Sequence, residues 1–108
     1  MSSSAITKSA LCDSLKKLCE QKPFDKISIS DITGECGLNR QSFYYHFQDK
    51  YELLSYIYLH ELFADITKGV NYDNWYERLE GFLVNMLKDK RFYSNTLKTV
   101  SYTHLRAH

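Results

Sequence analysis

The chain has 108 residues, 44% of them hydrophobic and 25% charged, which is ordinary for a folded domain and carries no signature of disorder. Its 14 Lys and Arg against 13 Asp and Glu leave a formal net charge of +1, and this balance excludes a broad polycationic surface. The length limits it to one domain at most or to a piece of a larger protein.

The first predicted helix runs from Ser4 to about Gln21. Apolar residues recur there at steps of three and four with charged residues between them, which is the pattern of an amphipathic helix. They are Ile6, Ala10, Leu11, Leu15, Leu18 and Cys19. Pro23, the single proline, marks the end of this helix because helical geometry is disfavoured before a proline.

Signals at both ends predict a short second helix. Ser28 and Asp31 have the spacing of a capping box, in which the hydroxyl and the carboxylate each accept from a backbone amide. The helix should therefore begin near Ile29. It should end near Glu35, because Gly37 can take the left-handed conformation that closes a helix.

Asn39 is a favoured cap for a third helix, expected from Arg40 to about His46. Apolar residues on both short helices recur at helical spacing, so the pair should pack together around the glycine turn as a helix-turn-helix. They are Ile29, Ile32, Leu38, Phe43 and Phe47. The outward residues of the third helix are donors and flat rings, which is typical of a helix that reads DNA. They are Arg40, Gln41, Ser42, Tyr44 and Tyr45.

The rest of the chain is also predicted to be helical. Asp49 and Glu52 repeat the capping box before a fourth helix, expected from Lys50 to about Lys68 and stopped by Gly69. A fifth helix should start near Asp73 or Asn74 and end near Asp89, and a sixth should begin around Arg91. The inward residues expected on the fifth are Trp75, Leu79, Phe82, Leu83 and Met86.

At the helix-turn-helix the chain resembles the TetR family of bacterial transcriptional regulators. The residues that carry the resemblance are Ser28, Ile32-Thr33, Gly37, Ser42, Tyr44-Tyr45-His46-Phe47 and Lys50. Thr33 departs from the usual Ala, and Asn39 stands where Ser is common. The resemblance covers residues 6–54 and extends more loosely to about Lys98, where YDNWYERLEGFLVNMLKDKRFYSNTLK is similar to the dihydroxyacetone kinase operon regulators, a branch of the family.

The resemblance implies an all-α fold: a three-helix DNA-binding domain, a long fourth helix and the first helices of a TetR-type C-terminal domain. The expected divisions are 1–49 for DNA binding, 50–99 for part of an effector-binding and dimerisation domain, and 100–108 for a tail. The tail, VSYTHLRAH, looks like one reading frame through a sequencing adapter, and the alternative is a genuine short tail that continues the sixth helix. On the adapter reading the regulator is truncated, and dimerisation, expected of the full-length protein, is doubtful for these 108 residues.

The same resemblance gives roles to side chains on double-stranded operator DNA. Tyr44, His46 and Lys50 are expected to contact phosphates, which positions the protein without reading sequence. Alternatives remain open, because Tyr44 can be a half-buried aromatic, His46 a structural histidine and Lys50 a solvated lysine.

Arg40 and Gln41, in the first turn of the recognition helix, are the predicted base readers, although Arg40 can equally neutralise a phosphate. Ser42 is expected either to touch a phosphate or to support the cap at Asn39, and Tyr45 belongs to the same predicted DNA-binding set. Ser28 and Ser30 would aim amides and hydroxyls at a phosphate from the start of the shorter helix, with plain capping as the alternative for Ser28.

Two other classes of function are weighed against DNA binding. An enzyme is not expected, because no catalytic motif is present and Cys36 near His46 lacks a third orienting group. A helical protein-interaction module without DNA binding is the main alternative, since the chain has nine tyrosines and six phenylalanines.

No cofactor and no metal is predicted, and the small-molecule effector or coactivator is not identified by the sequence. The three cysteines, Cys12, Cys19 and Cys36, form an odd set without C-x-x-C spacing, so no disulfide framework is expected. The N-terminus has no signal-peptide core and the chain has no apolar run of about 18 residues. We therefore expect a cytoplasmic protein with no membrane partner.

Overall fold

The computed structural model describes the backbone of residues 3–107 and the side chains of residues 3–101, and every element in that part of the chain is helical. The predicted all-α class is confirmed. In chain order the elements are α1 (Ser3–Cys19), η1 (Phe24–Lys26), α2 (Ile29–Glu35), α3 (Arg40–His46), α4 (Lys50–Ile57), η2 (Tyr58–Leu62), α5 (Ala64–Thr67), α6 (Trp75–Lys88) and α7 (Lys90–Ala107).

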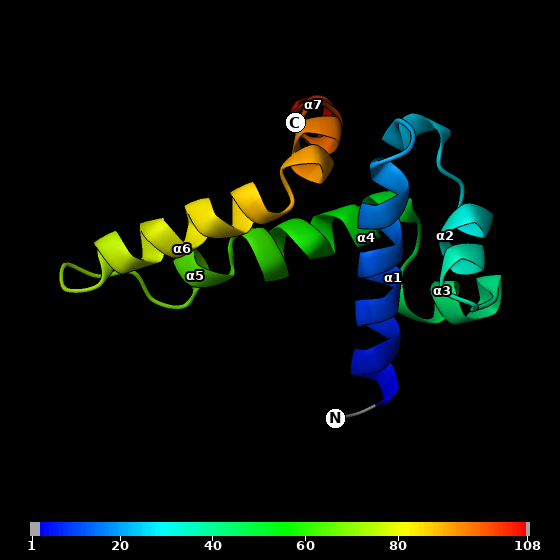
Figure 1. Cartoon of the computed structure of the whole chain (residues 1–108), viewed down its shortest axis with the longest axis horizontal. Helices are drawn as coiled ribbons and strands as arrows, with labels where there is room; N and C mark the ends of the chain where they lie inside the picture. The colour runs from blue at the N-terminus through cyan, green and yellow to red at the C-terminus, as the bar shows by residue number, and fades with distance from the viewer. Residues whose placement is uncertain (1–2, 108) are drawn as a thin grey trace.

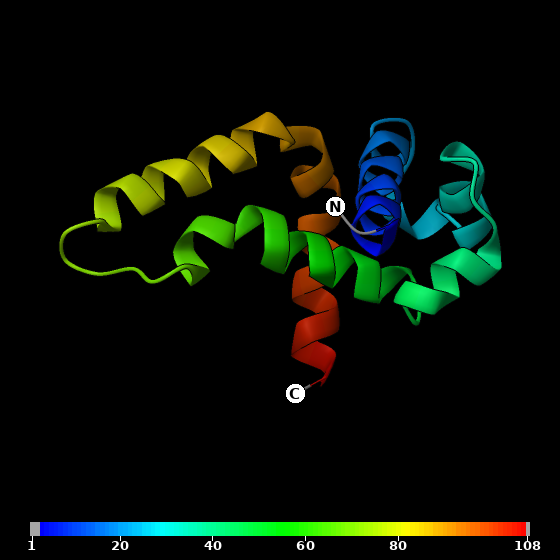
Figure 2. The ribbon, with the colours of Figure 1, turned by 90° about the horizontal axis from the view of Figure 1, so that it is seen from below.

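The helices form two groups that meet at α1 (Figure 1). Helices α1, α2 and α3 gather at one end, and α4 leads away from them with η2 and α5 nearly in line. Helix α6 runs back beside this rod, and α7 then crosses near α1 and α4 (Figure 2). We call α1 to α3 the head and the remainder the arm.

Backbone capping fixes α2 as the sequence predicts. The amide of Asp31 donates to Ser28 Oγ and the amide of Ser28 donates to Asp31 Oδ2, each at 3.0 Å, so both bonds of the capping box are present. Each bond satisfies an amide that a helix start leaves without a partner inside the helix. Both predicted bounds of α2 are confirmed.

The turn after α2 depends on Gly37. Its φ of 71° lies in the left-handed region, which a residue with a Cβ enters only at a cost. This conformation lets the Leu38 amide donate back to the Thr33 carbonyl at 2.9 Å and the Gly37 amide donate to the Gly34 carbonyl at 3.4 Å. The two bonds are those of a Schellman ending, and they aim the chain directly into α3.

Side-chain caps also start α3 and α4. Asn39 Oδ1 accepts from the amide of Ser42 at 2.8 Å, and Asp49 Oδ1 accepts from the amide of Glu52 at 2.8 Å. Of the two bonds of the predicted second capping box, only the one to the Asp49 side chain is formed as expected. The Glu52 carboxylate accepts from the backbone amide of Gln48, at 3.3 Å, and not from that of Asp49. The predicted starts of both helices are confirmed.

The core of the head is built from the apolar faces of its three helices. Ile32 and Phe43 are fully buried, Phe47 is buried beside them, and Ile29 and Leu38 pack at the edge. From α1, Leu11 and Leu15 enter the same cluster. Ser14, also buried on α1, donates to the Ile32 carbonyl at 2.6 Å. The predicted packing of the two short helices is therefore confirmed.

The single fourth helix predicted from Lys50 to Lys68 is wrong in one respect, because the rod is interrupted. Residues Tyr58–Leu62 form a π-helical segment, in which the Phe63 amide donates to the Tyr58 carbonyl, five residues back, at 2.9 Å. One extra residue rotates the next segment by roughly 100° about the helix axis. Beyond it, Phe63 stacks on Phe82 of α6 with ring centroids 5.6 Å apart.

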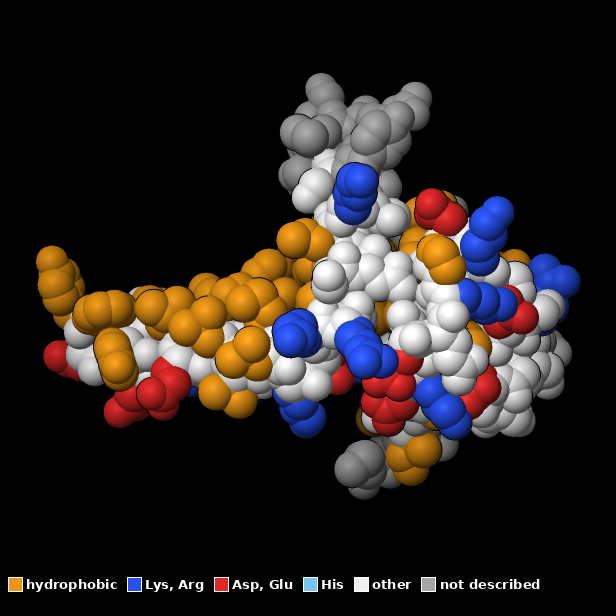
Figure 3. Space-filling view, turned by 45° about the horizontal axis from the view of Figure 1, so that its top comes forward, with side chains coloured by type: hydrophobic (Ala, Val, Ile, Leu, Met, Phe, Trp, Pro, Cys, Tyr) orange, Lys and Arg blue, Asp and Glu red, His pale blue; other side chains and the backbone are white. Residues whose placement is uncertain are grey.

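The inward face predicted for α6 is also partly wrong. Phe82 and Met86 pack against the core, but Trp75, Leu79 and Leu83 are exposed, Trp75 to 51%. These apolar residues do recur at the helical period. In the described part of the chain, however, no helix packs against the side of α6 on which Trp75, Leu79 and Leu83 lie. The result is a band of apolar side chains along α6 (Figure 3).

Helix α7 begins one residue before the predicted start and remains helical to Ala107. The predicted tail, residues 100–108, thus lies within this helix except for His108, which is outside the described residues. Buried Phe92, Tyr93 and Thr96 attach α7 to the rest of the arm, and the Tyr58 and Thr96 hydroxyls are hydrogen bonded at 2.8 Å. None of the described helices is long and apolar enough to cross a bilayer.

We predict opposite effects of alanine at two glycines three residues apart. Gly37→Ala should lower the free energy of unfolding by roughly 1 kcal/mol because of its left-handed φ. Gly34→Ala should raise it by roughly 0.5–1 kcal/mol, because Gly34 is helical and a Cβ there meets nothing within 4 Å. Urea unfolding of both variants measures the pair, and equal effects would contradict the assigned turn.

We also predict that the capping box makes stability depend on acid pH. The hydrogen bond from the Ser28 amide, followed by Lys22, lowers the pKa of Asp31 from 3.8 to about 2. A depressed folded pKa adds stability above the unfolded pKa, and this is lost as pH falls from about 4 to about 2. Asp31→Asn should therefore lose less stability than the wild type over that range. If urea unfolding gave the wild type and Asp31→Asn the same dependence of unfolding free energy on pH, the proposed contribution of the capping box would be wrong.

Candidate nucleic-acid interface

Helix α3 presents one face to the core and the other to solvent. On the inner face, Phe43 is fully buried. Its ring centroid lies 5.7 Å from that of Tyr44, in an edge-on contact, and 5.9 Å from that of Phe47. On the outer face, Tyr44 is 48% exposed and Tyr45 is 84% exposed. Burial of Phe43 thus orients the outward residues of a helix only seven residues long.

Arg40 and Tyr44 lie one helical turn apart and interact in the free protein. The Arg40 guanidinium donates to the Tyr44 hydroxyl at 3.4 Å, and its carbon lies 5.9 Å from the centre of the Tyr44 ring. Both side chains are exposed. The structure therefore brings a predicted base reader together with a predicted phosphate contact, and Gln41 stands exposed beside them.

A shallow hollow of about 260 Å³ separates the start of α1 from α3. The residues that line it are Thr7, Asn39, Gln41, Ser42, Tyr45 and His46. Four of these belong to the DNA-binding set predicted from the sequence. Thr7 was not predicted, because it lies more than thirty positions before the other residues of the hollow and no local pattern marks it. Only the packing of α1 beside α3 brings Thr7 to this hollow, and its hydroxyl donates to the Ser3 carbonyl at 2.9 Å.

The remaining α3 residues of the set have mixed positions. The backbone amide of Ser42 donates to the Asn39 cap, and Ser42 also lines the hollow, so both roles expected of its side chain stay predictions. His46 is partly exposed, and its ring meets the Tyr45 ring edge-on at 5.0 Å. That contact holds the imidazole at the rim of the hollow and not inside the core.

Two predicted phosphate contacts lie at the start of α2. Ser28 uses its hydroxyl to cap the helix, so the plain capping alternative is confirmed, and the side chain is nevertheless exposed. Ser30, in the first turn, is exposed as well. Helix α2 packs against α3 through the Schellman turn, so both serines belong to the same end of the molecule as the recognition helix (Figure 1).

Lys50 occupies a place that the sequence did not indicate. Its ammonium donates to the carbonyls of Phe24 and Ile27, both at 2.8 Å, and lies 4.5 Å from the centre of the Phe24 ring. Burial lowers its pKa. In this structure the lysine therefore ties the start of α4 to η1, and phosphate contact by Lys50 stays a prediction that requires the ammonium to leave these carbonyls.

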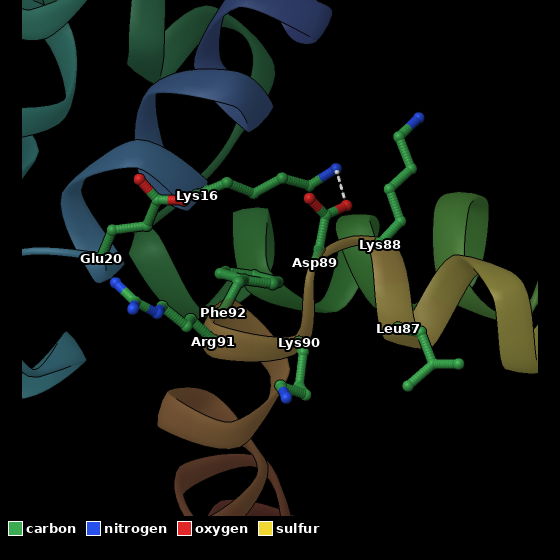
Figure 4. Close-up of a pocket in the computed structure, with 8 residues that line it drawn as sticks. All are labelled: Lys16, Glu20, Leu87, Lys88, Asp89, Lys90, Arg91 and Phe92. Atoms are coloured by element: carbon green, nitrogen blue, oxygen red, sulfur yellow. Dashed lines mark ion pairs between the residues drawn. The ribbon is translucent and has the colours of Figure 1, made fainter.

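A second hollow, of about 230 Å³, lies where α6 turns into α7 (Figure 4). Lys16 donates across it to Asp89 at 3.1 Å and also pairs with Glu61. Lys88 and Lys90 point away from each other. Most of the side chains that line this hollow are charged, and they either form ion pairs or point in different directions. The hollow therefore does not indicate which class of effector would bind there.

The cysteines have the surroundings of structural thiols. Burial raises the pKa of both Cys12 and Cys19 to about 12, which keeps them protonated. The Cys36 thiol donates to the Ile32 carbonyl at 3.4 Å.

Comparisons with known proteins point to the same end of the chain. Residues 11–57 match the family described as bacterial regulatory proteins, tetR family. The match spans most of α1, all of α2 and α3 and the whole of α4.

Two curated relatives extend the likeness beyond the head. The chain is 31% identical over 93 residues to the HTH-type dhaKLM operon transcriptional activator DhaS of Lactococcus lactis subsp. lactis (strain IL1403), covering 86% of this chain and 50% of that protein. It is 31% identical over 84 residues to the Transposon Tn10 TetC protein of Escherichia coli, covering 75% of this chain and 43% of that protein. The chain spans about half the length of the curated relatives it matches. With its helix-turn-helix, it belongs to the TetR family of bacterial regulatory proteins.

Proposed function

We propose that the chain acts in sequence-specific binding of double-stranded operator DNA, as part of a transcriptional regulator of the TetR type. The observation that carries the proposal is the exposed row of Arg40, Gln41, Tyr44 and Tyr45 on a capped recognition helix whose other face is fixed by Phe43. A helix of this kind enters the major groove through its N-terminal residues. In the proposal, Arg40 and Gln41 read bases, while Tyr44 and His46 contact phosphates together with Ser28, Ser30 and Ser42.

The charge balance indicates which interactions would provide the affinity for DNA. A net charge of +1 gives little general attraction to phosphate. Affinity must then come from placed contacts: the hydroxyls and rings on α3, the exposed start of α2 and the hydroxyl of Thr7 beside them. We therefore expect a modest dependence on salt, with sequence preference set mainly by the first turn of α3.

The whole regulator is proposed to work as a homodimer in the cytoplasm on a near-palindromic operator, with a small molecule or coactivator bound to its C-terminal part. Two recognition helices would then enter successive major grooves roughly 34 Å apart. The likeness to DhaS, an activator of the dhaKLM operon by its printed name, supports dihydroxyacetone kinase genes as the regulated targets. Membership of a family of regulatory proteins supports a regulator and not an enzyme.

A protein-interaction role is the second candidate, and the band on α6 favours it. Trp75, Tyr76, Leu79 and Leu87 are exposed along one helix, Leu87 to 65%, and contiguous apolar surface of this kind marks interaction sites. The band lies on the arm, away from α3 (Figures 1 and 3). The two roles are therefore compatible, and DNA binding by the head does not require the band to be free.

We predict that two substitutions on α3 change DNA binding differently. A duplex selected from a randomised pool and its scrambled counterpart are titrated over a salt series. Arg40→Ala should weaken binding to the selected duplex by roughly 1–3 kcal/mol and reduce the preference over the scrambled one. Tyr44→Phe should weaken binding to both duplexes about equally, because its lost hydroxyl contacts phosphate.

Matched controls come from the arm. Arg91→Ala removes the same charge from exposed α7, and Tyr72→Phe removes the same hydroxyl from a side chain that is 96% exposed between α5 and α6. Neither control should change affinity beyond the small effect of charge. Equal losses in Arg40→Ala and Arg91→Ala would overturn the role of α3.

A further inference from the structure

Asn95 makes three hydrogen bonds from α7 to the head. Its Nδ2 donates to the carbonyls of Cys19 at 2.9 Å and Lys22 at 3.1 Å, and its Oδ1 accepts from the amide of Phe24 at 3.1 Å. No sequence pattern marked this residue. We propose that Asn95 is a positioning residue for the DNA-binding head: through the backbone of Phe24 it fixes the turn that Lys50 grips at the start of α4.

The first step is the corner where α1 ends. The backbone amides of Glu20, Gln21 and Lys22 donate to the carbonyls of Lys17 and Leu18 and so close the helix locally. The carbonyls of Cys19 and Lys22 are instead satisfied by the Asn95 amide group. A helix end leaves such carbonyls without partners inside the helix, so one side chain completes this corner.

The second step concerns Phe24, because both Asn95 and Lys50 form hydrogen bonds to its backbone. Phe24 is 1% exposed, its amide donates to Asn95, and its carbonyl accepts from Lys50 at 2.8 Å. Its ring meets the Tyr51 ring edge-on at 5.5 Å. One buried residue is thus held from α7 on its N–H side and from α4 on its C=O side.

The third step links this turn to the recognition helix. Lys50 is the first residue of α4, and α3 ends at His46, so only Phe47, Gln48 and Asp49 separate them. Phe47 is buried in the core of the head. A shift of η1 that displaced Lys50 would therefore act on a short, packed connection to α3.

Other polar ties join the arm to α1 without reaching η1. Lys16 on α1 pairs with Asp89 at the α6–α7 junction (Figure 4), and it also pairs with Glu61 of η2. These ties reach α1 in its last turn but do not contact η1, and the buried Thr96 and Phe92 hold α7 in place next to Asn95. The effect of Asn95 on η1 can consequently be separated from the general attachment of the arm.

The test uses amide hydrogen exchange of the full 108-residue chain with Asn95→Ala. The informative amide is that of Ile27, which donates to the Phe24 carbonyl and not to Asn95, together with that of Phe47, which donates to the Phe43 carbonyl. We expect exchange at these amides to be faster by roughly tenfold, the loss expected when bonds of this kind are removed from a local opening equilibrium. Unchanged exchange at Ile27 would overturn the proposal.

Asn85→Ala is the matched control. Asn85 is a part-buried asparagine of α6 whose amide donates to the Glu61 carbonyl and to Asp65, inside the arm. It should leave exchange at Ile27 and Phe47 unchanged. If Asn95→Ala does not fold, Asn95→Gln keeps donor and acceptor on a longer stem and should show a smaller increase at the same amides. An equal increase in Asn85→Ala would mean general loosening and would overturn the proposal.

A second readout rests on the proposed function. Affinity for the selected duplex should fall at least roughly threefold in Asn95→Ala and remain unchanged in Asn85→Ala. Unchanged affinity in Asn95→Ala would overturn the positioning role. If the wild-type chain binds no duplex, the proposed function fails, and hydrogen exchange alone then decides whether Asn95 fixes η1.

Discussion

The two helices proposed to meet DNA are each seven residues long, and helices this short are not stable alone in water. Their stability has to come from caps, from the turn between them and from burial of a few apolar residues. Ser28, Gly37 and Asn39 supply the first two, and Ile32 with Phe43 supplies the third. The exposed face of α3 can carry polar and aromatic side chains because its inner face is fixed so completely.

This dependence on local chemistry explains why the head could be predicted from sequence. A capping serine, a glycine with positive φ and an asparagine cap each act over three or four residues, so their spacing alone marks where a helix begins or ends. The bounds of α2 and α3 follow from these signals. The outward position of Arg40, Gln41, Tyr44 and Tyr45 follows from the helical period once the bounds are known.

What sequence reasoning missed depends on contacts between distant residues. The π-helical segment at Tyr58–Leu62 interrupts a stretch whose apolar period looks continuous. Lys50 follows a helix-start pattern, yet its ammonium is hydrogen bonded to carbonyls about 25 positions earlier. Asn95 and Thr7 have no local pattern at all. The exposed side of α6 was misjudged because periodicity identifies an apolar face without saying what covers it.

Polar contacts join the head to the arm at its outer corner, beside the apolar cluster that the two share. Asn95 and Lys50 hold η1 from opposite sides, and Lys16 pairs with two acids of the arm. Such groups require specific geometry to offset their desolvation. A displacement of the arm would therefore have to break or carry along these contacts at the corner of the head.

The central claim is that α3 and the start of α2 form the surface that meets DNA. Amide chemical-shift mapping of the labelled chain with a duplex of roughly two half-sites, about 20 base pairs, at low salt tests it most directly. We expect the largest shifts at residues 28–31 and 39–46, with Thr7 among them and α6 unaffected. Shifts concentrated on α6, or spread without preference over the molecule, would contradict the account.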